Sequence, residues 1–123
     1  MAYQYNSKKA VPIRLTFNEQ ETQAFWNLVD KSSGQGPHGD CWEWRGARYQ
    51  NEKGTDGYGR LTVRRENLRA HRVAYMLGYN ENPGYQMVLH SCDHRPCCRP
   101  EHLSLGDAKK NREDMAARGR IGR

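Results

Sequence analysis

The sequence predicts a small α+β protein whose fold is stabilised by a bound metal ion. Its 123 residues suffice for one domain with a modest core, since only 36% of them are hydrophobic and the mean hydropathy is −1.07. Domains with so little apolar material are commonly stabilised by disulfides or by a metal, and the four cysteines could serve either purpose. Alternating segments typical of half-buried strands lie between helical patterns, which gives the α+β class.

We expect a basic arm over residues 1–15, followed by a helix and linker over residues 16–39. The sequence Thr16-Phe17-Asn18-Glu19 has the form of a capping box, so the helix should begin there and run to about Lys31. A glycine- and serine-rich segment would end it. The residues expected on its buried face are Phe25, Leu28 and Val29.

Residues 40–120 should form the main domain, with 121–123 as a tail. Its first part alternates apolar with polar residues and predicts antiparallel strands, with a tight turn at Arg65-Glu66-Asn67. Alternate residues of a strand share a face, so Arg60, Thr62 and Arg64 should lie together. Such a two-stranded ribbon fits the major groove of DNA, although an ordinary solvated face is the alternative.

The second part of the domain should contain a short helix, a strand and a last helix. The helix is expected from Ala70 to Leu77 and closed by Gly78. A short strand, Met87-Val88-Leu89-His90, follows. Asp107 should cap a final helix that continues to about residue 118.

The charge balance favours a nucleic-acid partner. The formal charge is +6 and the pI about 9.3, and arginine guanidinium groups suit phosphate oxygens and the guanine edge. No amphipathic helix carries this charge, and no apolar run approaches the ~20 residues of a membrane span, so a membrane is not expected. The polar start Met1-Ala2-Tyr3 does not resemble a signal peptide, and we expect an intracellular location. In a reducing compartment the cysteines predict a metal site rather than disulfides.

A structural zinc site is expected around the segment 92–102. Zinc prefers four tetrahedral nitrogen and sulfur ligands, and Cys92, Cys97 and His102 supply three of them. The fourth should be Cys41, which would tie the sheet to the C-terminal loop. The nearby Cys98 and His94 are the rivals for that position.

Two residues beside this cluster, His90 and Asn111, are not needed for zinc. Each taken alone has an ordinary structural explanation. In a strand–loop–helix unit fixed by zinc, however, the strand end and the first turns of the helix face each other. An imidazole there can activate water while an amide oxygen holds a hard cation against phosphate.

These residues follow one another at fixed spacings. One residue separates His90 from Cys92, four separate Cys92 from Cys97, four separate Cys97 from His102, and eight separate His102 from Asn111. Further motifs are Cys41-Trp42-Glu43-Trp44, Asp56-Gly57-Tyr58-Gly59-Arg60, Ala70-His71-Arg72-Val73-Ala74-Tyr75, Pro100-Glu101-His102-Leu103 and Met115-Ala116-Ala117-Arg118-Gly119-Arg120. Together they resemble the His-Cys box homing endonucleases and the related phage-type HNH nucleases. The resemblance covers roughly residues 40–120 and is far more specific than any single motif.

The resemblance implies a ββα-metal nuclease fold and a magnesium-dependent DNA endonuclease. His90 would be the general base, and Asn111 the protein ligand of a catalytic magnesium, for which manganese could substitute. Cys41, Cys92, Cys97 and His102 would hold the structural zinc. Either Arg69 or Arg72 would stabilise the transition state. The residues expected to contact DNA are Arg45, Arg48, Arg60, Thr62, Arg64 and Arg65.

The chain departs from the family pattern in two respects that bear on function. Leu89 stands where many HNH nucleases carry an acidic metal ligand before the base, so magnesium rests on Asn111. The chain also has no long dimerisation extension, although double-strand cutting by one small site would call for a homodimer. From the resemblance, we expect a sequence-specific, homing-type endonuclease that acts on double-stranded DNA as a homodimer. A nicking or low-specificity phage HNH nuclease is the alternative. A non-catalytic zinc-stabilised DNA-binding module is a third and less favoured hypothesis.

Overall fold

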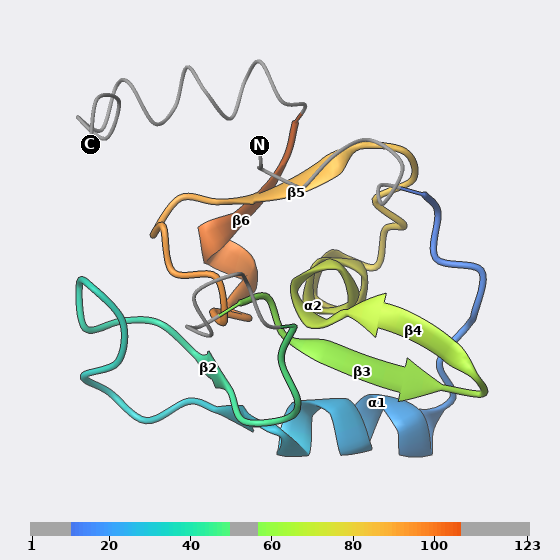
Figure 1. The fold of residues 1–123 in the computed structure, drawn as a ribbon, viewed down its shortest axis with the longest axis horizontal. Coiled ribbons are helices and arrows are strands. Elements are labelled where there is room, and N and C mark those ends of the chain that lie inside the picture. The colour runs from blue at the N-terminus through green and yellow to red at the C-terminus, as the bar shows by residue number, and fades with distance from the viewer. Residues whose placement is uncertain (1–10, 50–56, 107–123) are drawn as a thin grey trace.

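A computed structural model describes residues 11–49 and 57–106 and shows the expected α+β class (Figure 1). The strands pair antiparallel as three two-stranded sheets, β1–β2, β3–β4 and β5–β6. Among the described residues, no helix is long and apolar enough to cross a membrane. The elements in chain order are α1 (Glu19–Asn27), β1 (Val29–Asp30), β2 (Glu43–Trp44), β3 (Arg60–Val63), β4 (Glu66–Arg69), α2 (Ala70–Tyr79), β5 (Met87–His90), the 3₁₀ helix η2 (Pro100–His102) and β6 (Leu103–Gly106).

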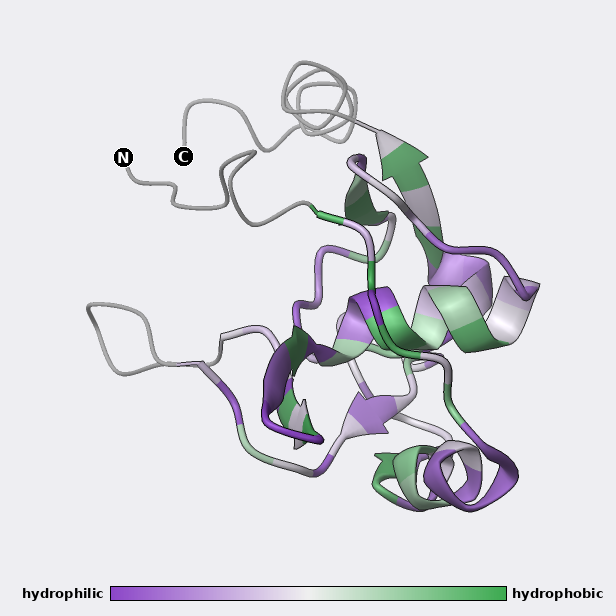
Figure 2. Ribbon diagram, turned by 90° about the vertical axis from the view of Figure 1, so that its right-hand side faces the viewer, coloured by the Kyte–Doolittle hydropathy of each residue, from purple (hydrophilic) through white to green (hydrophobic). Residues whose placement is uncertain are grey.

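The first helix begins and ends at residues other than those expected. Its capping box joins Asn18 to Glu21: the Asn18 side chain accepts a hydrogen bond from the Glu21 amide at 2.7 Å, and Glu21 Oε1 accepts from the Asn18 amide at 3.1 Å. The predicted box starting at Thr16 was therefore wrong by two residues. The helix stops at Asn27 rather than Lys31 because the next residues form β1 and pair with β2. One side of α1 is hydrophilic, as Figure 2 shows.

The arginine-rich ribbon is the hairpin β3–β4, in which Arg60 lies opposite Arg69. Its turn is formed by Arg64 and Arg65, whose φ angles of 47° and 72° match the positive values that two-residue hairpin turns require. The turn predicted at Arg65-Glu66-Asn67 was therefore misplaced, since Glu66 already belongs to β4. Arg64 consequently lies in the turn and not on the strand face with Arg60.

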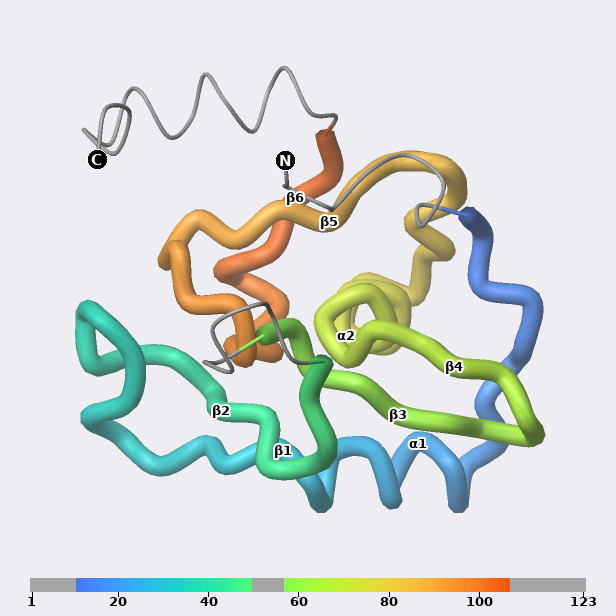
Figure 3. The backbone as a smooth tube through the Cα atoms, in the orientation of Figure 1, coloured from blue at the N-terminus to red at the C-terminus, as the bar shows by residue number. Residues whose placement is uncertain are grey.

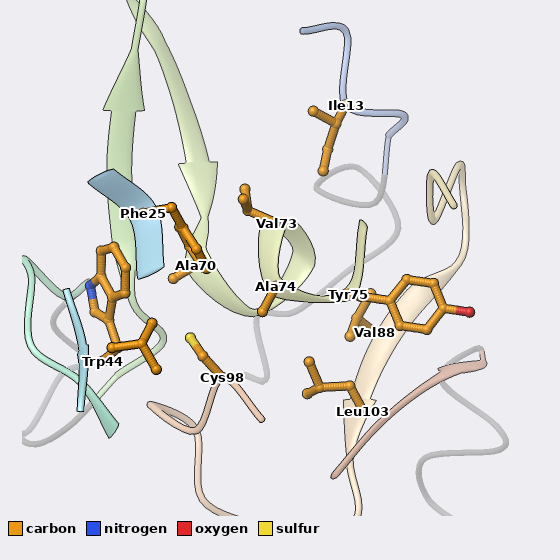
Figure 4. Close-up of a cluster of buried hydrophobic side chains, with 11 residues drawn as sticks. Ile13, Phe25, Trp44, Ala70, Val73, Ala74, Tyr75, Val88, Cys98 and Leu103 are labelled. Carbon is orange, nitrogen blue, oxygen red and sulfur yellow. The ribbon is translucent and has the colours of Figure 1, made fainter. Parts of the chain in front are cut away.

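Helix α2 follows β4 directly and forms the centre of the core (Figure 4). Trp44 is fully buried, and its ring lies 5.2 Å from that of Phe25 between centroids. The helix runs to Tyr79 and ends at Asn80 in the left-handed conformation, two residues beyond the expected closure at Gly78. Gly78 is required for a different reason, because a Cβ there would lie 2.5 Å from the Pro100 ring.

The predicted strand β5 is confirmed, and all four of its residues are buried. It pairs with β6, so that His90 lies opposite Leu103, whereas no strand had been expected at residues 103–106. The segment between them passes over β2, as the tube in Figure 3 shows, and the Trp44 amide donates to the Pro96 carbonyl at 2.9 Å. The N-terminal ten residues, Asn111 and the helix expected from Asp107 lie outside the described residues.

Candidate functional site

Cys41, Cys92, Cys97 and His102 form one cluster in which the possible ligand atoms all lie within 4.8 Å of one another. His102 Nδ1 is 3.4 Å from Cys97 Sγ and 3.8 Å from Cys41 Sγ. All four cysteines of the chain are free thiols. The predicted ligand set is thus brought together, and it could bind a metal such as zinc, which accepts three sulfurs and one imidazole.

Neither rival for the fourth position belongs to this cluster. His94 Nε2 lies 2.7 Å from Glu43 Oε1, which directs that imidazole to a carboxylate. Cys98 is buried in the main hydrophobic core near Trp44 (Figure 4), where burial raises the pKa of its thiol well above the usual value. Cys98 therefore acts as a small core residue.

A glycine-rich loop, residues 34–41, presents Cys41 to the cluster. The Gly34 amide donates to the Gly39 carbonyl at 2.9 Å, and the Cys41 amide donates to the Gln35 carbonyl at 3.0 Å. Gly36 adopts φ +80°, and a Cβ at this position would lie 2.4 Å from Cys41 Sγ. Glycine is therefore required here both by the backbone conformation and by the nearness of the thiol.

The other three ligand residues come from the connection between β5 and β6. Cys92 follows β5, and Asp93 turns the chain with φ 59°. The Cys97 amide donates to the His94 carbonyl at 2.9 Å, and the Cys98 amide donates to the Trp42 carbonyl at 2.7 Å. This pairing with the chain around β2 brings Cys97 beside Cys41, while the 3₁₀ helix η2 carries His102.

The thiols of the cluster have strongly perturbed and opposite proton affinities. Hydrogen bonding from Cys92 lowers the pKa of Cys97 to about 4. Burial raises the pKa of Cys41 to about 12, and the hydrogen bond to Cys97 raises the pKa of Cys92. Three sulfurs this close together cannot all lose their protons without a compensating cation. A divalent cation would relieve this conflict, because metal-bound thiols are deprotonated.

His90 lies at the end of β5, next to the metal cluster, and is buried. Its Nε2 is 3.0 Å from the Cys97 carbonyl oxygen. A carbonyl can only accept, so Nε2 carries the proton and Nδ1 keeps its lone pair. Burial is the main cause that lowers the pKa of His90 to about 4. The imidazole is therefore neutral at pH 7, as a proton acceptor must be.

Two further rings extend from His90 toward the β3–β4 hairpin. The His71 ring stacks on that of His90 at 4.8 Å between centroids, and the Tyr58 ring stacks on His71 at 4.7 Å. The guanidinium carbon of Arg69 lies 5.2 Å from the Tyr58 ring centroid, and that of Arg95 lies 5.5 Å from it. The Tyr58 ring is also 5.9 Å from that of His90, so the three rings form one cluster with positive charge gathered beside it.

The two arginines expected near the reacting phosphate occupy different environments. The Arg72 guanidinium is buried and donates to the carbonyls of Val11, Gly84 and Gln86 at 2.8, 2.7 and 2.6 Å. Its hydrogen bonds tie the segment around Val11 to the loop before β5. Arg69 instead lies over the rings of Tyr49 and Tyr58, beside the cluster of rings that includes His90.

Most of the side chains expected to contact DNA also bind within the protein. Arg45 pairs with Asp30 at 3.0 Å and Arg48 with Glu43 at 2.9 Å. Arg64 pairs with Glu21 at 3.3 Å, which fixes the hairpin turn to α1. The Thr62 hydroxyl donates to Asn67 Oδ1 at 2.7 Å. Of the remaining two, Arg60 lies over the Tyr49 ring and Arg65 is exposed in the turn.

Sequence reasoning did not single out Tyr58, His71 or Arg95 for the site. Tyr58 and His71 belong to motifs recognised in the sequence, but their stacking with His90 joins three separate segments of the chain. No local pattern carries that information. Asn111, the expected magnesium ligand, lies outside the described residues.

The fold and site define a small α+β protein with a Cys₃His cluster able to hold a metal ion. The chain is 43% identical over 82 residues to "Protein 2.8" of Escherichia phage T7, a match that covers 65% of this chain and 52% of that protein. It is 41% identical over 81 residues to "Protein 7.7" of the same phage, covering 66% and 58% respectively. The chain thus spans little more than half the length of these relatives. No family model and no solved structure matches it.

Proposed function

We propose that the chain is a magnesium-dependent DNA endonuclease with a zinc-stabilised fold. The observation that carries this proposal is the place of His90: a buried, neutral imidazole whose Nε2–H is held by the backbone of Cys97. A histidine whose only role was to hold zinc would point its ring at the metal cluster, and that role is filled by His102. His90 is oriented as a separate proton acceptor.

In this proposal Nδ1 of His90 takes a proton from a water molecule as the water oxygen attacks phosphorus. The phosphorus–O3′ bond breaks and the departing O3′ takes a proton from solvent water, which leaves a 3′-hydroxyl and a 5′-phosphate. Arg69 is the better placed of the two candidate arginines to face the phosphate, because Arg72 is committed to three backbone carbonyls. Magnesium at Asn111, with manganese as a substitute, would neutralise the charge of the departing oxygen.

The zinc ion would have a structural role, since all four tetrahedral positions are filled by protein ligands. The fit of the residues supports this, as the three sulfurs and the imidazole nitrogen converge from two separated segments. The proposed partner is double-stranded DNA, contacted through Arg60 and Arg65 of the hairpin and through Arg69. A homodimer and a homing-type, sequence-specific activity remain part of the proposal.

The decisive experiment is cleavage of several supercoiled plasmids by zinc-loaded protein with and without magnesium. We compare the parent with His90→Ala and with His38→Ala, a matched removal of an exposed imidazole. Cleavage should require magnesium and fall by about 10²-fold or more in His90→Ala, the contribution typical of a general base. His38→Ala should cleave like the parent. Full activity of a zinc-loaded His90→Ala protein would overturn the assignment.

The products distinguish the alternatives within the proposal. Linear DNA with one set of ends indicates a homing-type enzyme that cuts both strands. Open circles indicate a nicking enzyme, and a smear indicates low specificity. Steeply salt-dependent binding to the plasmids without cleavage would support the DNA-binding module instead.

A further inference from the structure

The two ring nitrogens of His102 face different groups. Nδ1 is directed at the sulfurs, 3.4 Å from Cys97 Sγ and 3.8 Å from Cys41 Sγ. Nε2, on the other edge of the ring, lies 3.4 Å from Oδ2 of Asp40. The imidazole is therefore placed between the metal cluster and a carboxylate, and it is largely shielded from solvent.

The backbone of Asp40 is held in place by two interactions. Its carbonyl accepts a hydrogen bond from the Arg99 guanidinium at 2.9 Å. It forms a β-bridge with Gln35, and the next amide, that of Cys41, donates to the Gln35 carbonyl. One loop thus supplies consecutive residues to the site: the Cys41 thiol to the metal side of the His102 ring, and the Asp40 carboxylate to its outer side.

We propose that Asp40 is the positioning residue of the metal site: it accepts a hydrogen bond from the Nε2–H of His102 and so fixes the tautomer in which Nδ1 binds the metal. An imidazole must be neutral and have the correct nitrogen unprotonated to act as a ligand. A carboxylate on the far nitrogen secures the tautomer, orients the ring and makes the ligating nitrogen more basic. This inference rests on the proposed metal site and does not depend on nuclease activity.

An ordinary ion pair between Asp40 and His102 would give the ring a different protonation state. Such a pair needs a protonated imidazolium, whose Nδ1–H would then point at the sulfur cluster and exclude a metal from that position. With a metal bound, the ring is neutral and Asp40 acts as a hydrogen-bond acceptor. Asp40 touches no metal-ligand atom in this scheme, and its effect is exerted through His102.

The test is zinc affinity, measured by competition with a chromophoric chelator for the parent, Asp40→Ala, Asp40→Asn and Glu101→Ala. Glu101 is the matched control, since it is an exposed acid next to His102 in sequence whose carboxylate pairs with Arg99 at 3.4 Å. Asp40→Ala should weaken zinc binding about 10- to 100-fold, the usual cost of losing such a partner. Asp40→Asn retains an acceptor oxygen and should recover part of this loss. Glu101→Ala should bind like the parent.

A second measurement distinguishes positioning from a general loss of stability. Long-range proton–nitrogen NMR of the His102 ring in the zinc-loaded parent should show Nδ1 bound to metal and a slowly exchanging Nε2–H. The Nε2–H should exchange faster with water in Asp40→Ala but not in Glu101→Ala. Equal zinc affinities in these two variants would overturn the inference and leave the metal site intact. A parent that binds no zinc would overturn the metal site and the inference together, whatever its activity on DNA.

Discussion

Nε2 of His90 lies 3.0 Å from the carbonyl oxygen of Cys97, so the proposed base is hydrogen-bonded to the backbone of a residue in the metal cluster. The imidazole does not enter the cluster itself. Its orientation nevertheless depends on the conformation of the chain at Cys97, which the bound metal would hold. The metal would therefore act on catalysis indirectly, by fixing the direction in which Nδ1 of His90 points.

Replacing Cys97 by alanine should release the metal and abolish cooperative unfolding of the part of the chain that the structure describes. Loss of one thiolate leaves three ligands and frees the backbone that holds His90. The expected result is a protein without stoichiometric zinc, with a broad thermal transition and no cleavage of DNA. Zinc content and melting curves measure this outcome.

The control for this prediction is Cys98→Ala. Cys98 is the neighbouring buried cysteine, but it packs in the hydrophobic core and not in the cluster. This variant should retain one zinc and melt cooperatively, with a loss of about 1 kcal/mol in the free energy of unfolding. If both variants kept their zinc, Cys97 would not be a ligand.

Gly36→Ala and Gly34→Ala should have different effects on the metal although both backbones have positive φ. The φ angles are +80° and +88°, so each substitution carries a similar backbone cost of about 1 kcal/mol. At Gly34 an added Cβ meets nothing within 4 Å, whereas at Gly36 it would lie 2.4 Å from Cys41 Sγ. Only Gly36→Ala should therefore weaken zinc binding. Equal zinc affinities would show that the 34–41 loop does not present Cys41 to the metal.

Substitutions of Arg72 and Arg69 should separate stability from activity. Arg72→Ala removes the partner of three backbone carbonyls and should lower the free energy of unfolding by about 2–3 kcal/mol, as expected for hydrogen bonds to a charged group. Arg69→Ala should unfold near the parent temperature but lose cleavage. Denaturant titrations and plasmid cleavage rates measure the two effects. A stable Arg72→Ala protein that lacked activity would reverse the assignment.

The stability of the protein should fall as the pH is lowered below about 6.5, partly because of His71. Burial, aided by the nearby His90, Arg69 and Arg72, holds the pKa of His71 well below its ordinary value of 6.5, and a backbone interaction with Val88 opposes this only in part. The unfolded chain therefore takes up a proton below pH 6.5 that the folded protein does not. Each such proton costs about 1.4 kcal/mol per pH unit.

The variant His71→Phe, which keeps a ring in the stack, isolates this contribution. Unfolding by denaturant between pH 6.5 and 5, with excess zinc throughout, should show a shallower dependence on pH than in the parent. Above pH 6.5 the His71 contribution is absent from the parent as well, so the two proteins should show the same dependence on pH. An unchanged slope in His71→Phe would show that His71 does not titrate on unfolding.

The sequence predicted the elements that have strong local patterns and missed those that depend on contacts with distant residues. Helix α2 was found because its apolar residues Val73 and Leu77 recur at helical spacing, and β5 was found as a short apolar run that leads into the cysteine segment. The position of α1 was ambiguous, since Thr16 and Asn18 are both capping residues with a glutamate three positions later. The structure selects Asn18, while the Thr16 carbonyl accepts a hydrogen bond from Arg64. Strand β6 has no comparable pattern, because it exists only as the partner of β5.

In the candidate site, too, local patterns were predicted and contacts between distant residues were not. Cys92, Cys97 and His102 were predicted from the short spacings typical of metal ligands, and Cys41 was added as the fourth ligand that tetrahedral zinc requires; the structure brings all four together. The contacts of Arg72 and the approach of Asp40 to His102 could not be predicted. Each joins segments that are far apart in the chain, and no sequence pattern shows that such segments come together. The ring cluster of His90, His71 and Tyr58 was missed for the same reason.

The separation of Cys41 from His102, 61 residues along the chain, has a consequence for the order in which the protein is made. The β3–β4 hairpin and α2 are adjacent in sequence and can form soon after they leave the ribosome. Cys41 emerges earlier than all of these, and its three partners emerge only after them. The Cys41 thiol therefore waits for its partners while the hairpin and α2 can already form, and the complete ligand set exists only once His102 has emerged. In cells starved of zinc, molecules should accumulate that have a formed helical centre and an unattached 34–41 loop.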